Sequence, residues 1–384
     1  MSAAVIIETK APTFVMMVAF PCGSIHESEK HYGISHLLEH MMFVSTSVSQ
    51  SIGVYRKFIA LGAQFNASTT KDYTNYYVKC ADEHSVAAAR LLLVMLAELR
   101  FTAAEFEREK RVVIEEIVMH HSFTLKPWFR GTPYYNTIGG YPETLHAITY
   151  DDIVRYHKMH YCRTCATIGV VCMRKYKGAL SRLLDAKRSE AIVPTIDFNL
   201  GRKLGPENRL VLYKQPDEIG TLVYMTYPAF DSRAFVCKLV AWILKVRLIE
   251  LLRHKLGLVY SVSVKQISQA HIGHLEIHFK SSVAPCSRML ALVKGEIRKL
   301  VRGISVADFE GYYHAYTQYL SNRRVHVDFV AYLTEQVVGR MYGVNSVYST
   351  AYADFVAVCR AIFVPAACAF KIQTRSSKHI DGRV

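Results

Sequence analysis

The stretch His36-Leu37-Leu38-Glu39-His40 contains the residue types and the spacing with the clearest chemical potential in this sequence. In a helix, position 39 lies about 60° to one side of position 36 and position 40 about 40° to the other, so the three side chains share one face. Two neutral imidazoles four residues apart can hold one Zn²⁺. A carboxylate beside them can take a proton from water on the metal, so the pattern predicts a metal site with its own general base.

The histidine pair alone is weak evidence for a metal site. With 17 histidines in 384 residues, one pair at this spacing is expected by chance, and a second pair does occur at His274 and His278. Those two histidines alternate with the apolar residues Leu275 and Ile277, which is typical of a strand. We therefore expect the second pair to form the polar face of a strand and not a metal site.

A third ligand is available further along the chain. The order His-x-x-Glu-His is the inverted form of the common zinc-protease helix, and a catalytic zinc keeps three protein ligands and one open position. Glu109 and Glu116 are seven residues apart in a helical pattern, within about 20° of each other around the axis. We expect Glu116 to be the carboxylate ligand and Glu109 to accept a hydrogen bond from a ligand imidazole. Each acid taken alone fits a solvated helix face better than a ligand site, so the prediction depends on the set.

Helices and strands must position these residues, and apolar periodicity predicts where they lie. Helices are expected at 33–46, 84–99, 103–120, 150–160, 178–186, 234–252, 287–301 and 307–322. Strands are expected at 4–21, 64–70, 73–79, 166–171, 210–214, 222–227, 259–264 and 274–280. The two halves follow a similar order, so we predict an α+β fold of two related domains, each a mixed β-sheet packed with helices. The expected boundaries are residues 1–190, a linker at 191–208 and residues 209–384.

Composition restricts the class of protein. A hydrophobic content of 51% is ample for two cores, and the chain shows no run of about 18 uncharged apolar residues, so we expect no membrane span. The first residues lack the basic region of a signal peptide or presequence. Nine scattered cysteines then favour reduced thiols, and Cys162 and Cys165 are expected to be two incidental thiols. We expect a cytoplasmic location, with an organellar or viral origin left open.

The net charge of +15 raises the question of nucleic acid. Lysines and arginines are spread along the chain, often beside acids, and no nucleic-acid-binding motif accompanies them. We expect the charge to serve solubility and steering, with nucleic-acid binding a minor alternative.

Taken together, the candidate residues resemble one family. Residues 33–43, Gly-Ile-Ser-His-Leu-Leu-Glu-His-Met-Met-Phe, are similar to the Gly-x-x-His-[Phe/Leu]-Leu-Glu-His-Met-x-Phe motif of the pitrilysin/insulinase-type inverzincins, which include mitochondrial processing peptidases and bacterial zinc peptidases. In that family a Glu-x6-Glu pair follows some 75 residues after the motif. Here Glu109 and Glu116 form such a pair, and 75 residues lie between His40 and Glu116. Residues 62–70 resemble the family's Gly-Gly-x-Phe-Asn-Ala-x-Thr strand, and residues 252–261 its Arg-x6-Tyr segment.

The resemblance implies a zinc metalloendopeptidase that hydrolyses unfolded peptides or short polypeptides. In it, Zn²⁺ would be held by His36, His40 and Glu116, with Glu39 as the catalytic base. Arg253 and Tyr260 would bind substrate or stabilise the oxyanion. An extended peptide would pair with the strand that contains Phe65, Asn66, Ala67, Ser68 and Thr69.

The resemblance also implies a partner. A chain of this size is half of the family's long form, so we expect a homodimer, or a heterodimer with a subunit of the same fold, that encloses a chamber. Arg253 and Tyr260 of one subunit would then face the zinc of the other. The alternative is a non-catalytic partner or scaffold subunit, as exists in processing peptidases; such partners typically lack zinc or base residues, and all of these are present here.

Overall fold

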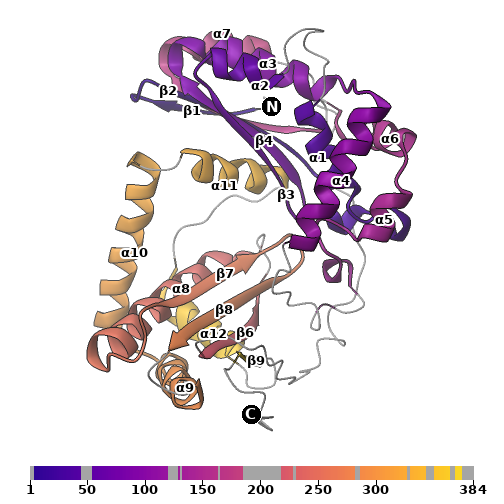
Figure 1. Ribbon diagram of the computed structural model, residues 1–384. Helices are drawn as coiled ribbons and strands as arrows, with labels where there is room; N and C mark the ends of the chain where they lie inside the picture. The colour runs from indigo at the N-terminus through magenta and orange to yellow at the C-terminus, as the bar shows by residue number, and fades with distance from the viewer. Residues whose placement is uncertain are drawn as a thin grey trace. The chain divides into compact units, whose positions relative to one another are not determined.

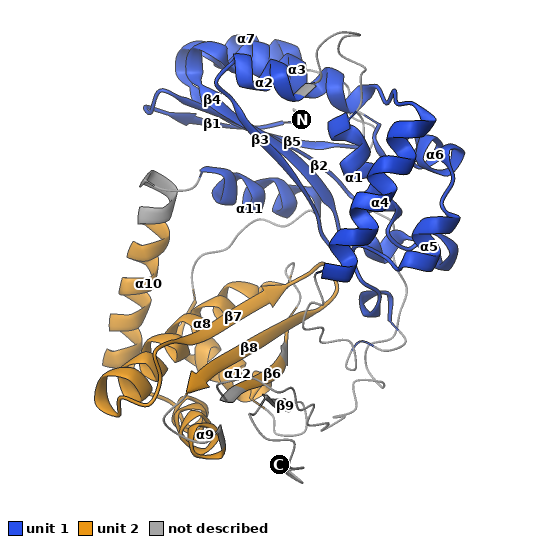
Figure 2. Cartoon of the chain, in the orientation of Figure 1, with its two compact units in different colours: residues 1–200, 326–345 blue, residues 201–325, 346–384 orange. Residues whose placement is uncertain are grey.

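The computed structural model in Figure 1 describes residues 4–44, 54–119, 129, 132–162, 165–184, 218–227, 231–281, 286–326, 329–342, 350–363 and 368–373. The predicted linker at 191–208 and strand at 210–214 lie outside these residues. The chain divides into two compact units (Figure 2): unit 1 is residues 1–200 with 326–345, and unit 2 is residues 201–325 with 346–384. Each unit holds a sheet with helices packed on it, which confirms the predicted α+β fold. None of the described helices is long and apolar enough to span a bilayer.

Unit 1 contains a five-stranded sheet in the order β1-β5-β2-β4-β3. Its strands are β1 (Ala4–Thr9), β2 (Thr13–Phe20), β3 (Gln64–Thr69), β4 (Thr74–Ala81) and β5 (Thr167–Met173). Its helices are α1 (Ile34–Val44), α2 (Val54–Ala60), α3 (Ser85–Ala97), α4 (Ala103–Met119), α5 (Pro142–Ala147), α6 (Tyr150–His160), α7 (Arg174–Leu184) and α11 (Phe329–Met341). Short 3-10 turns are η1 (Ser24–His26), η2 (Glu29–His31), η3 (Asp82–His84) and η5 (Pro133–Tyr135).

The single strand expected at residues 4–21 is two strands. Pro12 lies between β1 and β2 and has no N–H group to donate to a ladder, so the chain breaks there. β1 pairs in parallel with β5, while β2 pairs antiparallel with both β4 and β5.

β2 is buried on both of its faces, which explains its nearly continuous apolar sequence. Phe14, Met16, Val18 and Phe20 belong to the core shared with α1 and α3, and the alternate residues pack against α11. Figure 1 shows α11 on the opposite side of this sheet from α3 and α7. The expected second domain, 209–384, therefore differs from unit 2 by one helix: α11 buries Leu333, Val337 and Met341 in unit 1.

Unit 2 contains an antiparallel sheet in the order β7-β8-β6-β9. Its strands are β6 (Glu218–Thr226), β7 (Val262–Ser268), β8 (Gly273–Ser281) and β9 (Cys368–Gln373). Its helices are α8 (Ala234–Leu248), α9 (Cys286–Arg302), α10 (Val306–His326) and α12 (Tyr352–Ile362). The helix expected at 234–252 is α8 followed directly by a π-helical segment, η7 (Ile249–Lys255).

One expectation about the cysteines is wrong. Cys162 and Cys165, expected to be incidental thiols, are joined in a disulfide. The turn before β5 brings their Cα atoms to 5.2 Å, within the range that a disulfide requires. Cys22, Cys80, Cys172, Cys237 and Cys359 are free and buried.

Candidate metal centre

Helix α1 places His36 and His40 on one face, one turn apart. The opposite side of the helix is anchored in the core of unit 1 by Leu37, Leu38, Met41 and Met42, all fully buried. The half-buried Glu27 caps the helix start: its Oε2 accepts from the Gly33 N–H at 2.7 Å and its Oε1 from the Ser35 N–H at 2.9 Å. These contacts fix both the start and the rotation of the helix that carries the histidines.

Helix α4 brings its acids to the same place. Glu116 Oε2 lies 3.4 Å from His40 Nε2 and 4.0 Å from His36 Nε2. Glu109 Oε2 lies 3.8 Å from His40 Nδ1, which is the ring nitrogen that does not face Glu116. That distance is too long for a hydrogen bond, but Glu109 is on the side of His40 where the expected acceptor should lie.

The donor set fits a zinc ion. One ligand atom each from His36, His40 and Glu116 lie within 4.8 Å of one another. Ligands at about 2.0–2.1 Å from a tetrahedral zinc are themselves about 3.3 Å apart. The separation of 3.4 Å between Glu116 and His40 matches this value, while the other separations are wider. Among the residues that the structure describes, this is the one group of three or more metal-binding side chains at such distances.

The electrostatics favour the metal-binding form of the histidines. Burial, together with the nearby His40, holds the pKa of His36 below its usual value, while Glu116 acts in the opposite direction. A neutral imidazole is the form that binds a metal, so His36 needs no deprotonation at neutral pH. His36 Nδ1 is buried and finds no hydrogen-bond partner among the described residues.

Glu39 lies on α1 between the two histidines and is bound by a residue of another element. The Thr69 hydroxyl, at the end of β3, donates to Glu39 Oε2 at 2.5 Å. Burial raises the pKa of Glu39, and the bond from Thr69 partly offsets this effect. Sequence reasoning placed Thr69 only in the substrate strand and missed this contact; the alternation of β3, which turns Thr69 towards α1, was the available signal.

Two glycines that sequence reasoning did not single out let these elements approach one another. A Cβ atom on Gly139 would lie 2.9 Å from Ile117 Cγ1 on α4 and 3.7 Å from His36 Nδ1. A Cβ atom on Gly140 would lie 2.1 Å from the Tyr32 carbonyl oxygen, just before α1. Any larger residue would push the loop away from both ligand helices.

The predicted substrate strand is β3, an edge strand of its sheet. Gln64, Asn66 and Ser68 are exposed, whereas Phe65, Ala67 and Thr69 are half-buried. Phe65 stacks on Phe58 with ring centroids 4.4 Å apart. Within the described residues, the edge of β3 away from β4 pairs with no other strand, which leaves its backbone groups available to an extended peptide.

Arg253 and Tyr260 lie in unit 2. Arg253 is on the π-helical segment η7, and Tyr260 follows it just before β7. The Arg253 guanidinium lies 5.5 Å from the centre of the Tyr260 ring, and Tyr260 is 86% exposed. A tyrosine ring so exposed beside an arginine is available to a ligand.

The second histidine pair lies on strand β8, as expected. His274 Nε2 and His278 Nε2 lie 3.1 and 2.9 Å from the two carboxylate oxygens of Glu276 between them. The carboxylate therefore separates the two imidazoles.

Sequence comparison identifies relatives, chiefly for the amino-terminal part of the chain. The sequence model of the family "Insulinase (Peptidase family M16)" matches residues 4–125. The chain is 36% identical over 156 residues to the uncharacterized zinc protease YmxG of Bacillus subtilis, in an alignment that covers 38% of each chain. It is 22% identical over 348 residues to an uncharacterized zinc protease of Rickettsia bellii, covering 85% of this chain and 81% of that one. It is 30% identical over 147 residues to human mitochondrial-processing peptidase subunit beta, covering 36% of this chain and 30% of that subunit.

Solved structures share the fold over almost the whole chain. A protease from Helicobacter pylori superposes with a TM-score of 0.80 at 19% identity, covering 96% of both chains. An inactive M16 peptidase domain from Pseudomonas fluorescens also superposes with a TM-score of 0.80, at 14% identity, covering 98% of this chain and 96% of that one. At such identities the likeness shows the fold alone. The chain is therefore similar to the insulinase family of peptidases, family M16, in sequence over residues 4–125 and in fold over nearly its whole length.

Proposed function

We propose that the protein is a zinc-dependent endopeptidase acting on unfolded peptides or short polypeptides. One observation supports this most directly: two imidazoles and a carboxylate from separate helices converge, and Glu39 lies on the same helix as the imidazoles. His36, His40 and Glu116 would hold the ion. Zinc, when bound, supplies Lewis-acid polarisation and lowers the pKa of water.

Glu39 is the residue that would move the proton. Its Oε2 accepts a hydrogen bond from Thr69, so its Oε1 would take a proton from the water that attacks the peptide carbonyl and would return it to the leaving amine. The buried position that raises the pKa of Glu39 also brings it closer to the range that suits a general base. Arg253 and Tyr260 would bind the substrate or donate to the developing oxyanion, each contributing about 3–4 kcal/mol.

The open edge of β3 would bind the substrate. Backbone pairing with Phe65, Ala67 and their neighbours holds an extended chain without regard to most of its side chains. A folded protein offers no free backbone of this kind, which is why we propose unfolded peptides as substrates.

The experiment is a comparison of wild type with Glu39→Gln. We expect Glu39→Gln to retain one zinc per chain and to lose hydrolysis of an unstructured fluorogenic peptide by at least about 100-fold. His40→Ala should lose both zinc and activity, while an exposed control variant, Glu115→Gln on α4, should keep both. Full activity in Glu39→Gln would contradict the assignment.

The second candidate is a non-catalytic subunit of the same fold, and the likeness to the inactive M16 domain of Pseudomonas fluorescens is the observation in its favour. Such a protein would be inert alone and would increase the activity of a partner. Zinc binding by wild type without any peptide hydrolysis would support this second function.

We also propose a same-fold partner, either a second copy or a related chain. The name of the human relative, subunit beta of a processing peptidase, supports an assembly of more than one chain. Size-exclusion chromatography with light scattering, on the protein alone, distinguishes a homodimer from a chain that awaits a different partner.

A further inference from the structure

We propose that Lys110 is a positioning residue for the metal centre: it fixes α4, and with it Glu109 and Glu116, to the junction between α5 and α6. The inference rests on the zinc site proposed above. Lys110 is only 6% exposed, and lysine is rarely so buried unless its cation has partners. Sequence reasoning had no reason to separate it from the neighbouring basic residues of α4.

The contacts of Lys110 define a fixed point. Its Nζ donates to the Ile148 carbonyl oxygen at 2.9 Å and lies 3.2 Å from Glu107 Oε1. It also lies 4.6 Å from the centre of the Phe106 ring. Ile148 is itself buried and is the residue that ends α5. A charged donor on a buried carbonyl is directional and costly to break, so it fixes α4 both along and around its axis.

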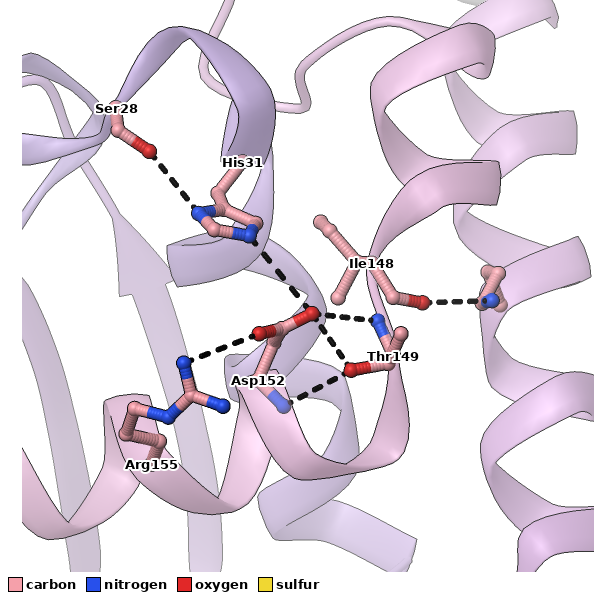
Figure 3. Close-up of polar contacts among 7 residues, drawn as sticks. Ser28, His31, Ile148, Thr149, Asp152 and Arg155 are labelled. Carbon is pink, nitrogen blue, oxygen red and sulfur yellow. Dashed lines mark hydrogen bonds and ion pairs between the residues drawn. The ribbon is translucent and has the colours of Figure 1, made fainter.

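The α5–α6 junction in turn lies beside the segment that leads into α1. Figure 3 shows Asp152 at the centre of these contacts, with His31 on one side and Thr149 on the other. Asp152 Oδ2 accepts from the Thr149 N–H at 3.0 Å and lies 3.7 Å from His31 Nε2. His31 Nδ1 is 3.0 Å from the Ser28 hydroxyl.

A hydrogen bond ties α5 to the same segment. The Thr144 hydroxyl donates to the Tyr32 carbonyl oxygen at 2.7 Å, one residue before Gly33. The helix that carries the histidines and the helix that carries the acids are therefore both anchored to α5 and its end, α1 through Tyr32 and α4 through Lys110.

The place of Lys110 on α4 explains why its contacts affect the position of the candidate ligands. Lys110 is about 100° around the helix from Glu109 and six residues, about 9 Å, from Glu116. It therefore holds α4 on a side adjacent to the one that faces the histidines, and touches no ligand itself. Metal ligands must be held within about 0.5 Å of their working positions, so a small slide or rotation of α4 would weaken the site.

The test is the zinc affinity of Lys110→Met, measured by competition with a chromogenic chelator on the full chain. Methionine keeps the apolar stem and removes the donor. We expect zinc affinity to fall by about 10-fold or more, because residues that orient ligands typically change affinity by 10–100-fold. Arg111→Met, an exposed position on the same helix, should leave affinity unchanged. The visible spectrum of the Co²⁺ form should change in Lys110→Met and not in the control.

Two further measurements keep the outcomes separate. Thermal unfolding of the metal-free variants shows whether they fold; if Lys110→Met does not, Lys110→Leu, which also lacks a donor, is titrated instead. Wild-type zinc affinity and an unchanged Co²⁺ spectrum in a folded Lys110 variant would overturn the inference and leave a purely structural lysine. Absence of zinc binding by wild type, or its retention in His40→Ala, would instead refute the proposed zinc site.

Discussion

Glu39 depends on a residue that lies thirty positions away. Thr69 comes from β3 and donates to Glu39 Oε2 at 2.5 Å, so the strand proposed to bind substrate also orients the proposed base. A hydrogen bond to a charged group is worth about 1.5–3 kcal/mol. Binding of a peptide at β3 and the orientation of Glu39 are therefore coupled through one hydroxyl group.

We predict that Thr69→Val lowers kcat by about 10-fold or more and leaves zinc affinity unchanged. Valine has nearly the same shape as threonine but cannot donate, so Glu39 loses its fixed orientation at a cost of about 1.5–3 kcal/mol. Steady-state kinetics on an unstructured peptide and a zinc titration measure the two quantities. Thr69→Ser, which restores the donor, should recover most of kcat. An unchanged kcat in Thr69→Val would show that the contact does not orient the base.

At the scale of elements, the start of α1 depends on a half-buried carboxylate. Glu27 accepts hydrogen bonds from the N–H groups of Gly33 and Ser35, and this favours its charged form. Burial has the larger effect and raises the pKa of Glu27 to about 7, with Gly33, Ser35 and Lys71 opposing the shift. The helix that carries the histidines is therefore held by a group that titrates near neutral pH.

This shift predicts how the stability of the fold changes with pH. The pKa of Glu27 in the folded chain, about 7, is above the ordinary value of 4.5 for the unfolded chain, so the folded state binds more protons between these values. The stabilisation from Glu27 is fully present below pH 4.5 and is lost as pH rises through 7, by a total of about 3 kcal/mol. Urea unfolding of the metal-free protein from pH 4.5 to 8 measures it.

Glu27→Gln is the reference because glutamine does not titrate. The free energy of unfolding of wild type relative to this variant should fall across the pH window, while contributions from other groups cancel. A difference that stays constant from pH 4.5 to 8 would show that Glu27 is not shifted.

The elements that sequence predicted well are those with local signals. The helix expected at 150–160 matches α6 because Thr149 and Asp152 form a capping box that is readable in four residues. The helices around His36 and Glu116 were predicted within a few residues because one face of each is apolar. The burial of α11 against β2 was not predicted, because it depends on contacts between residues about 300 positions apart. The π-helical turn at Arg253 has no sequence signature that we could use.

The grouping of His36, His40 and Glu116 was predictable for a similar reason. His36, Glu39 and His40 share a helix, and Glu116 follows at a spacing that the family resemblance supplies. Gly139 was missed because its importance lies in its approach to Ile117 and His36, which are distant in sequence. Periodicity within one helix or strand can be recognised in a single sequence, whereas contacts between distant elements cannot.

At the scale of the whole molecule, the candidate residues are divided between the two compact units. The candidate metal ligands His36, His40 and Glu116 are in unit 1, whereas Arg253 and Tyr260 are in unit 2. The family resemblance implies an active form of two chains of this fold, in which Arg253 and Tyr260 of one chain would face the zinc site of the other. In a dimer with two-fold symmetry both sites would be completed in the same way.

Mixing two inactive variants tests this sharing. We predict that Glu39→Gln and Tyr260→Phe, each nearly inactive alone, regain up to about a quarter of wild-type activity when exchanged at equal amounts. In a symmetric dimer about half of the dimers would be mixed, each with one complete site. The matched control mixes wild type with the double variant Glu39→Gln/Tyr260→Phe: activity should fall to about a quarter of that of undiluted wild type if the residues act across the interface, and to about half if they act within one chain. Confirmed subunit exchange without recovery in the first mixture would place Tyr260 and Glu39 in the same chain, because only then does a mixed dimer gain no complete site.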